Sequence, residues 1–406
     1  MDLFDKAQHF TIAKDAMAAG IYPYFQPLSN SEGTTATFMG HEVIMLGSNN
    51  YLGLTMHPKV KAAAQQAIEL FGTSCTGSRF LNGTLEFHKE LDRRLAAFVG
   101  AEAAIVFPTG YQTNLGTISS LVGKGDYVIL DKDAHACCVD GALLSRGELR
   151  RFAHSDMDSL RSVLSKIPAD AGKLIVVDGV YSMGGDIAPL PQIIEIAREF
   201  GARVMVDDAH SIGVLGNGRG TAAHFGLTMD DVDLVTGTFS KSFASIGGFV
   251  AGKADVIHYI QHTARSLIFS ASLPAANAMT VLAALDVIES EPELVQRVWD
   301  NANFMREGLK ALGFDTGPSE TPIIPVIIGE DYVRAGLAWR ALVDNGVYTN
   351  PVIPPAVPPN RTLLRTSYIA THTREQLEKA LSIFEMVGEN LDLIPPKDER
   401  ERLKTM

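Results

Sequence analysis

Several short apolar runs, each followed directly by chemically reactive side chains, constrain the fold of this chain more than any other feature of its sequence. Runs of this kind are typical of buried strands. Three of them span residues 127–130, 204–206 and 232–235. The side chains that follow them include His135, Asp207, His210 and Lys241. Because ligands of an open parallel sheet bind outside the carboxyl ends of its strands, we expect these side chains to meet in one crevice.

Lys241 narrows the chemistry most. By itself, a lysine in this position would more simply be a solvated loop residue. Close to the end of a buried strand, however, a charged amine is costly unless it is used, because burial disfavours its charged form. A desolvated lysine amine is a nucleophile that forms a Schiff base with a carbonyl compound. Pyridoxal 5'-phosphate (PLP) needs such a lysine for its aldehyde and a carboxylate facing its pyridinium nitrogen, and Lys241 and Asp207 supply this pair.

Strand and helix patterns alternate from Ala103 onward, which predicts an α/β fold with a mostly parallel, doubly wound sheet. We expect seven strands, at residues 103–107, 127–130, 174–177, 204–206, 232–235, 249–251 and 267–269. The first strand leads through a turn at Gly110 into a helix. A glycine there lets backbone N–H groups reach an anion at the positive end of the helix, so we place the cofactor phosphate at Gly110. Tyr111 is then able to cover the cofactor ring.

The chain divides into four predicted segments. They are an N-terminal helix and hairpin (1–46), a large PLP-binding domain (47–290), a smaller α+β C-terminal domain (291–394) and a charged tail (395–406). Further predicted elements are helices at 5–19, 58–71, 86–98, 190–199, 332–345 and 373–387, a hairpin at 34–46, strands at 323–328 and 362–367, and an extended proline-rich link at 350–359. Thr373 and Gln376 have the spacing of a capping box. The loop at 72–84, which contains Arg79 and Asn82, fits either an ordinary surface loop or a substrate-facing one.

Charge and cysteine content restrict the partners and the compartment. The net charge of −12 argues against nucleic acid or an anionic membrane as the main partner. The three cysteines, Cys75, Cys137 and Cys138, are an odd number, which favours a reducing compartment. The start of the chain lacks a signal-peptide pattern, and no apolar run approaches the roughly 18 residues of a membrane span. We therefore expect a cytoplasmic protein without a transmembrane segment.

Two readings from other classes compete with a PLP enzyme. A metallohydrolase could ligate a divalent metal with acidic and histidine side chains chosen from Asp131, Asp133, His135, Asp207, Asp208 and His210. That reading gives no role to Lys241 or to Gly110 and Tyr111, and our own prediction contains no metal. A non-catalytic binding subunit is the second alternative, and loss of the lysine would be its signature. A P-loop is disfavoured because Ala254 stands where the magnesium-binding hydroxyl is required.

The sequence resembles the α-oxoamine synthase family of fold-type I PLP-dependent enzymes from about residue 47 to residue 388. The motifs that carry the resemblance are Ser48-Asn49-Asn50-Tyr51-Leu52-Gly53, Thr109-Gly110-Tyr111, Asp133-Ala134-His135, Val206-Asp207-Asp208-Ala209-His210 and Gly237-Thr238-Phe239-Ser240-Lys241. Each motif is modest by itself, and their combination is highly specific. Enzymes of this family join an amino acid to an acyl thioester with loss of carbon dioxide.

The resemblance implies a role for each site residue. Lys241 would carry the cofactor as a Schiff base and act as the general base, Asp207 would pair with the pyridinium nitrogen, and His135 would stack on the ring. His210 would bind the ring hydroxyl. The residues implied to hold the ring or the phosphate are Gly110, Tyr111, Ser182, Thr238 and Ser240. Ser270 would reach the phosphate of a neighbouring subunit, which implies a homodimer. Arg365 would bind the substrate carboxylate, with Asn50 nearby.

Within the family, the stretches 77–84 and 239–242 resemble bacterial serine palmitoyltransferases. This resemblance implies condensation of L-serine with palmitoyl-CoA to 3-oxosphinganine, CoA and carbon dioxide, the first step of sphingolipid synthesis. One position departs from the pattern, because Ile353 stands where several of these enzymes have an arginine, which leaves Arg365 as the main carboxylate anchor. The 8-amino-7-oxononanoate synthases (alanine plus a pimeloyl thioester) and glycine C-acetyltransferases are the alternatives. The sequence leaves open the acyl chain length, the choice between CoA and acyl carrier protein, and any peripheral membrane association.

Overall fold

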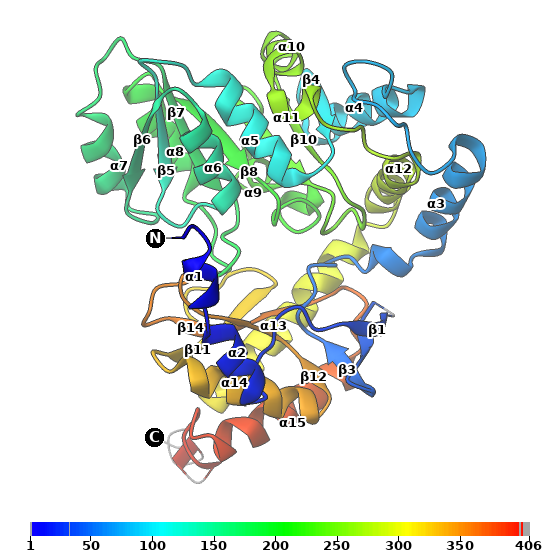
Figure 1. Cartoon of the computed structure of the whole chain (residues 1–406), viewed down its shortest axis with the longest axis vertical. Helices are drawn as coiled ribbons and strands as arrows, with labels where there is room; N and C mark the ends of the chain where they lie inside the picture. The colour runs from blue at the N-terminus through cyan, green and yellow to red at the C-terminus, as the bar shows by residue number, and fades with distance from the viewer. Residues whose placement is uncertain (1, 32, 398, 401–406) are drawn as a thin grey trace. The chain divides into compact units, whose positions relative to one another are not determined.

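The computed structural model describes residues 2–31, 33–397 and 399–400, which form two compact units. One unit contains residues 49–299. The other combines the described parts of 1–48 and 300–406. The division falls inside helix α13 (Glu293–Leu312). The elements of both units are labelled in Figure 1.

A mostly parallel sheet, with seven strands among the described residues, crosses the larger unit (Figure 1). In spatial order the strands are β4 (Ala103–Phe107), β10 (Gly248–Gly252), β9 (Leu234–Thr238), β8 (Arg203–Asp207), β7 (Lys173–Asp178), β5 (Tyr127–Asp131) and β6 (Glu148–Phe152). β10 pairs antiparallel with both of its neighbours, and the other strands share one direction. The predicted architecture of the sheet is confirmed.

One of the predicted strands is wrong, and another segment takes its place. Residues 267–269 were expected as a strand, but α11 (Arg265–Ile268) is a short helix whose Leu267 is buried in the core beside α5 (Gly110–Leu121). The seventh strand of the sheet is instead β6, which was not predicted and which pairs with β5 at one edge of the sheet. Its sequence is mostly polar and largely exposed, because an edge strand needs few apolar side chains. A search for apolar runs therefore missed it.

Helices cover both faces of this sheet. Val128 and Leu130 of β5 belong to one apolar core with Ile118 of α5, whereas Ile129 belongs to a second core with Ile193 of α8. This alternation follows from the two-residue period of a strand. The helices of this unit are α3 (Pro58–Phe71), α4 (Glu86–Val99), α5, α6 (Ala136–Leu144), α7 (Met157–Leu164), α8 (Leu190–Glu199), α9 (Thr221–His224), α10 (Ala254–Thr263), α11 and α12 (Ala275–Ser290), with the 3-10 turns η1 (Leu54–Met56) and η2 (Gly216–Gly218). The sheet is thus buried on both sides, as parallel sheets usually are.

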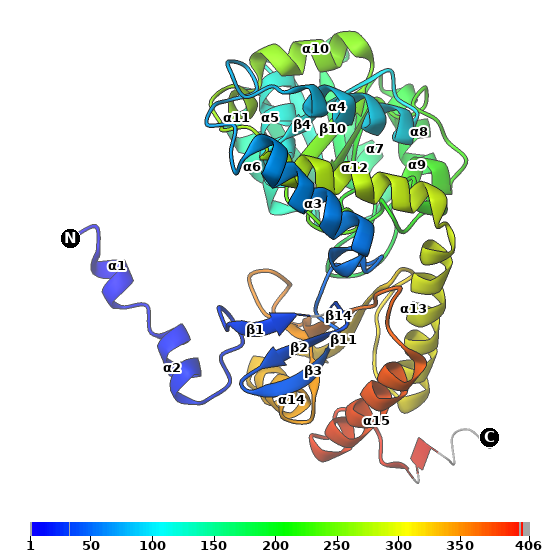
Figure 2. The ribbon, with the colours of Figure 1, turned by 90° about the vertical axis from the view of Figure 1, so that its right-hand side faces the viewer.

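Local sequence signals predicted where helix α3 begins and ends. It starts at Pro58 and ends before Gly72, as predicted, because proline suits the first helical position and glycine tolerates the positive φ of +72° at the end. Figure 2 shows α3 lying alongside α12, with which it is in contact.

The described residues of the smaller unit form two sheets. Their strand orders are β1 (Leu28–Ser31), β2 (Thr35–Phe38), β3 (His41–Met45) and β12 (Val347–Tyr348) in one, and β11 (Ile323–Gly329), β14 (Thr362–Ser367) and β13 (Asn350–Val352) in the other. The β2–β3 hairpin was predicted, and β12 adds to β3 in parallel. Phe38 and Trp339 pack edge to face in the core of this unit, which joins its N-terminal and C-terminal parts.

The helices of this unit are α1 (Asp5–Gln8), α2 (Ile12–Ala18), α14 (Tyr332–Asp344) and α15 (Arg374–Asn390), together with the later part of α13. Thr373 and Gln376 form the predicted capping box at the start of α15. Two expectations were wrong in part. The helix expected at 5–19 is broken into α1 and α2, neither of which buries a residue, and the proline-rich link contains strand β13. In the described part of the chain, no helix has the length and apolar character to cross a bilayer.

Candidate active site

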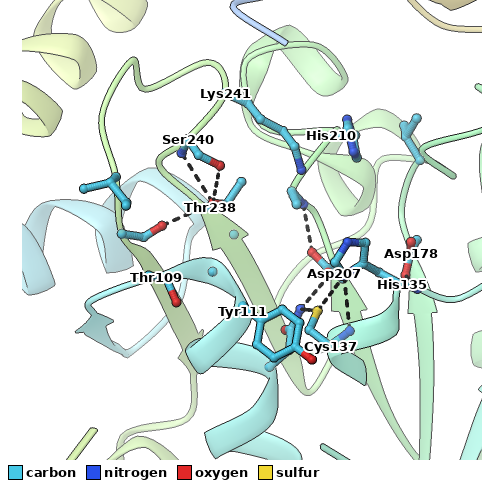
Figure 3. Close-up of a pocket in the computed structure, with 17 residues that line it drawn as sticks. Thr109, Tyr111, His135, Cys137, Asp178, Asp207, His210, Thr238, Ser240 and Lys241 are labelled. Atoms are coloured by element: carbon cyan, nitrogen blue, oxygen red, sulfur yellow. Dashed lines mark hydrogen bonds between the residues drawn. The ribbon is translucent and has the colours of Figure 1, made fainter. Parts of the chain in front are cut away.

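A cavity of about 360 Å³ opens at the carboxyl end of the sheet in the larger unit (Figure 3). The parallel strands β4, β5, β7, β8 and β9 all end there, so the segments that follow them converge. The predicted site residues that line it are Gly110, Tyr111, His135, Asp207, His210, Thr238, Ser240 and Lys241. The crevice expected from the strand ends is therefore present.

Asp207 ends strand β8 and is buried, with both carboxylate oxygens bonded. The Ala209 backbone N–H donates to Oδ1 (3.0 Å), and Asn114 Nδ2 donates to Oδ2 (2.6 Å). Thr236 on the neighbouring strand donates to Asn114 Oδ1 (2.7 Å), which fixes the orientation of the amide. These bonds hold a carboxylate rigidly at the base of the cavity.

His135 stands at the start of helix α6, where its side chain takes the N-cap position. Its Nδ1 lies 2.9 Å from Cys137 Sγ, and its backbone N–H donates to Asp178 Oδ1 (3.2 Å). The hydrogen bond to Cys137 raises the pKa of His135 to about 9, despite burial, which acts in the opposite direction. Burial and the nearby Asp207 raise the pKa of Asp178 well above its ordinary value.

A set of small hydroxyl and glycine residues forms another wall of the cavity. Thr109 caps helix α5 by accepting a bond from the Gln112 backbone N–H (3.1 Å). Thr238 Oγ1 lies 2.9 Å from Ser240 Oγ. A Cβ placed on Gly110 would lie 2.7 Å from Thr238 Oγ1, so only glycine lets the turn approach this strand. Hydroxyl groups beside the N-terminus of a twelve-residue helix are suited to an anion such as phosphate.

Lys241 extends into the cavity between this wall and the side that carries Asp207 and His210 (Figure 3). Tyr51 Oη lies 2.7 Å from His210 Nδ1, which fixes the histidine ring. Tyr111 lines the cavity with an exposed ring, and its hydroxyl donates to Asp140. The cavity thus offers a primary amine, a fixed carboxylate and an anion-binding wall around one space.

The other predicted site residues do not line this cavity. Ser182 follows strand β7, and Ser270 follows α11, where its Oγ accepts a bond from Gln112 Nε2 (3.2 Å). Asn50 donates to Thr55 Oγ1 (2.8 Å). Arg365 belongs to the smaller unit, where it is buried on β14 and donates to Ser367 Oγ (3.3 Å).

The metal alternative loses its proposed ligand set. Asp131 and Asp186 hold His154 between them, at 2.9 and 2.8 Å, and Asp208 accepts bonds from Thr221. Among the described residues, the group whose ligand atoms cluster tightly enough to be considered for a metal is Cys137, Cys138 and Asp207. Of these three residues, only Asp207 belongs to the ligand set that the sequence offered for a metal.

The cavity residues that sequence reasoning missed include Asn114, Cys137 and Asp178. Asp178 could have been found, because it directly follows the predicted strand at 174–177 in the same way as Asp207 follows its strand. Arg79, in contrast, is buried away from the role that the sequence allowed it in a substrate-facing loop. Its side chain is 4% exposed and pairs with Asp92 at 2.7 Å.

The aminotransferase class I and II family matches residues 41–384, most of the chain. The chain belongs to this family. Among similar proteins, a serine palmitoyltransferase from Sphingobacterium spiritivorum is 49% identical over 93% of this chain and 95% of its own. One from Bacteriovorax stolpii is 50% identical over 90% and 87%. An 8-amino-7-oxononanoate synthase from Thermoanaerobacter pseudethanolicus is 43% identical over 93% and 95%.

Solved structures of family members agree with this assignment. Serine palmitoyltransferase from Sphingomonas wittichii superposes with a TM-score of 0.94 and 40% identity, over 97% of this chain and 100% of its own. A structure described as SPT with PLP internal aldimine gives a TM-score of 0.93 at the same identity and coverage. The predicted fold-type I architecture and the resemblance to α-oxoamine synthases are therefore confirmed.

Proposed function

We propose that this protein is a PLP-dependent α-oxoamine synthase that condenses L-serine with palmitoyl-CoA, giving 3-oxosphinganine, CoA and carbon dioxide. The observation that carries the proposal is the cavity in which Lys241 and Asp207 lie with the anion-binding wall at Gly110. The serine palmitoyltransferases named above, at 49 and 50% identity, support the choice of reaction within the family.

The residues of the cavity fit PLP. Asp207 would face the pyridinium nitrogen, because its carboxylate is fixed by Asn114 and the Ala209 backbone. The phosphate would lie at Gly110, with hydroxyls from Thr238 and Ser240 and further contacts from Tyr111 and Ser182. Lys241 would hold the aldehyde carbon, His210 the ring hydroxyl and His135 the ring face. Bound in this way, PLP supplies an electron sink for the bonds broken at the substrate Cα.

The protein's own residues would then move protons and orient the substrate. Lys241 Nζ, free once the substrate amine takes its place, would accept the proton from the serine Cα, a general-base role that requires the amine to be uncharged. Asp207 would lie against the ring nitrogen as its hydrogen-bond partner. In the net reaction, a bond forms between the serine Cα and the acyl carbon, while the acyl carbon–sulfur bond and the bond from Cα to the carboxylate break. The sulfur leaves as a thiolate that takes a proton from solvent, and carbon dioxide departs. The electron pair left on Cα would take a proton back from Lys241.

Arg365 is our proposed anchor for the substrate carboxylate, with Asn50 assisting. The guanidinium is buried, and the carbonyl oxygen of Ser48 accepts a bond from Ser367, the hydroxyl to which Arg365 donates. A guanidinium held in this way presents paired donors that match the two oxygens of a carboxylate. Arg365→Lys should raise KM for the amino acid more than it lowers kcat.

A substrate panel distinguishes the candidates within the family. Serine, glycine and alanine are each offered with palmitoyl, pimeloyl and acetyl thioesters, and we expect turnover to be highest with serine and palmitoyl-CoA. Highest turnover with alanine and the pimeloyl thioester would instead identify an 8-amino-7-oxononanoate synthase. A long acyl chain gains about 0.8 kcal/mol for each buried methylene group, so affinity should rise with chain length.

Lys241→Ala tests the chemistry directly. After borohydride reduction and dialysis under denaturing conditions, the wild type should keep the reduced cofactor covalently attached and the variant should hold none, and the variant should lose more than about a thousandfold of turnover. Wild-type turnover in this variant would refute the proposal.

We also propose a homodimer in which Ser270 reaches the phosphate of the second subunit. Phe269, which precedes Ser270 in the chain, is a large apolar side chain that is 74% exposed in the single chain. Phe269→Asp should shift the molecular mass measured by light scattering from dimer to monomer.

We retain the predicted cytoplasmic location, which the free cysteines Cys75, Cys137 and Cys138 support.

A further inference from the structure

Cys137 lies at the base of the candidate active site, where three hydrogen-bonding groups surround its sulfur. His135 Nδ1 is 2.9 Å from Sγ, and Asn114 Nδ2 is 3.1 Å from it (Figure 3). The Cys138 thiol forms the third bond. The residue is 2% exposed, yet it lines the cavity.

Two of these bonds have a fixed direction. An amide nitrogen only donates, so Sγ must accept from Asn114, whose orientation is set by Thr236. Cys138 is buried, and its hydrogen bond with Cys137 and its burial raise the pKa of its thiol well above the ordinary value. Cys138 therefore stays protonated and is a donor to Cys137, and Asp207 Oδ2 is a second acceptor, 4.0 Å from its Sγ. A sulfur that accepts from several donors is stabilised in its thiolate form.

The contact between His135 Nδ1 and Cys137 Sγ decides whether Nδ1 carries a proton. The Cys137 backbone N–H lies 3.3 Å from Nδ1, which by itself would favour an unprotonated Nδ1. Sγ is closer to Nδ1, at 2.9 Å, and it already accepts from two other groups. A proton on Nδ1 that is donated to sulfur satisfies all three contacts at Sγ, so we place it there.

We propose that Cys137 and His135 form a thiolate–imidazolium pair, and that Cys137 is a positioning residue that keeps the His135 ring oriented and protonated where it faces the cofactor. This rests on the proposed function, in which His135 lies on the cofactor ring. Because Nδ1 is committed to sulfur, Nε2–H remains a donor for a group bound in the cavity.

Charged and titratable groups on the neighbouring elements surround the Cys137–His135 pair. They are Asp207 on β8, Asp178 on β7, Cys138 on α6, Tyr111 on α5 and Lys241 after β9. The bonds from Cys138 and His135 lower the pKa of Cys137 to about 6, and the bond to Cys137 raises that of His135 to about 9. Between these values both members of the pair are charged.

Cys137→Ser in the holoenzyme is the main test, because a serine hydroxyl fills the position without ionising. If activity requires charged His135, its alkaline limit should move from about 9 in the wild type towards the ordinary histidine value of about 6.5. Activity at lower pH should change little. Cys137→Asp restores a negative charge and should move the limit back, which a merely structural role would not produce. Cys75→Ser, outside the cavity, is the matched control for loss of a thiol.

Ultraviolet absorbance of the thiolate tests the pair without any substrate. The difference between wild-type and Cys137→Ser holoenzyme should titrate near pH 6. A thiolate that forms only near the ordinary value of about 8.5, or identical pH profiles in the two proteins, would overturn the proposal. If the absorbance titrates as expected but the substrate panel shows no condensation, the pair stands and the proposed reaction is wrong.

Discussion

Asn114 and Asp207 are joined by a hydrogen bond of 2.6 Å between Nδ2 and Oδ2, although 93 residues separate them. Asn114 belongs to helix α5 and Asp207 ends strand β8. The bond links the segment that would hold the cofactor phosphate to the carboxylate that would face its ring nitrogen.

Asn114→Ala should weaken PLP binding. It removes a donor to a charged group, and such bonds contribute about 1.5–3 kcal/mol, which corresponds to roughly a ten- to hundredfold rise in Kd. Titration of apoenzyme with PLP, followed by absorbance, measures the change. Thr236→Val removes only the bond that orients the amide, and it should have a smaller effect. Equal affinities in wild type and Asn114→Ala would show that the bond does not support the cofactor.

Gly110→Ala should also impair the cofactor site. The added Cβ would lie 2.7 Å from Thr238 Oγ1 and 2.8 Å from its Cβ, closer than such atoms approach in proteins. The turn and the strand must then separate, and the affinity for PLP should fall about tenfold or more. Gly123→Ala is the control, since its Cβ would meet only Asp126 Oδ2, at 3.4 Å. A PLP titration of both variants decides the matter, and similar Kd values would contradict the prediction.

Arg79→Met should destabilise the larger unit strongly. The Arg79–Asp92 pair is buried, and removal of one partner leaves an uncompensated charge, at a cost of about 3–5 kcal/mol. The midpoint of urea unfolding measures the loss. The double variant Arg79→Met/Asp92→Asn leaves no buried charge and should regain part of the stability. Arg93→Ala breaks an exposed pair with Glu90 and should be almost neutral. A similar loss of stability in Arg79→Met and Arg93→Ala would show that the buried pair contributes no more than the exposed one.

His154 should make stability depend on pH. Burial lowers its pKa, but hydrogen bonds to Asp131 and Asp186 outweigh that effect and raise the pKa to about 10. Because the folded value is raised, the stabilising contribution is complete below the unfolded value of about 6.5 and is lost as pH rises through about 10.

The thermal midpoint of His154→Gln measures this contribution. It should lie furthest below that of the wild type at pH 6 or lower, where the loss in the free energy of unfolding is on the order of 2 kcal/mol, and the gap should close towards pH 10. His258→Gln, at an exposed position on α10, should leave the midpoint unchanged throughout. A gap that widens with rising pH would reverse the assigned charge state.

Local signals were sufficient wherever a short stretch determines its own conformation. Pro58 and Gly72 delimit α3, and Thr373 with Gln376 starts α15, because these residues satisfy or replace backbone groups within one turn. The polar residues after β5, β8 and β9 were expected to converge because parallel strands end at one edge of a sheet. Local patterns were therefore enough to predict the α/β architecture and most of the polar residues at the centre of the cavity.

Which segments become neighbours depends on how the whole chain folds. β6 is a strand because β5 offers it a partner, and β10 runs antiparallel although its sequence reads like that of its neighbours. The contacts of Asp207 with Asn114, of His135 with Cys137 and of Arg79 with Asp92 depend on positions in space. Spacing along the chain predicts a contact within a helix turn or a strand end, but burial and pairing across elements are properties of the whole fold.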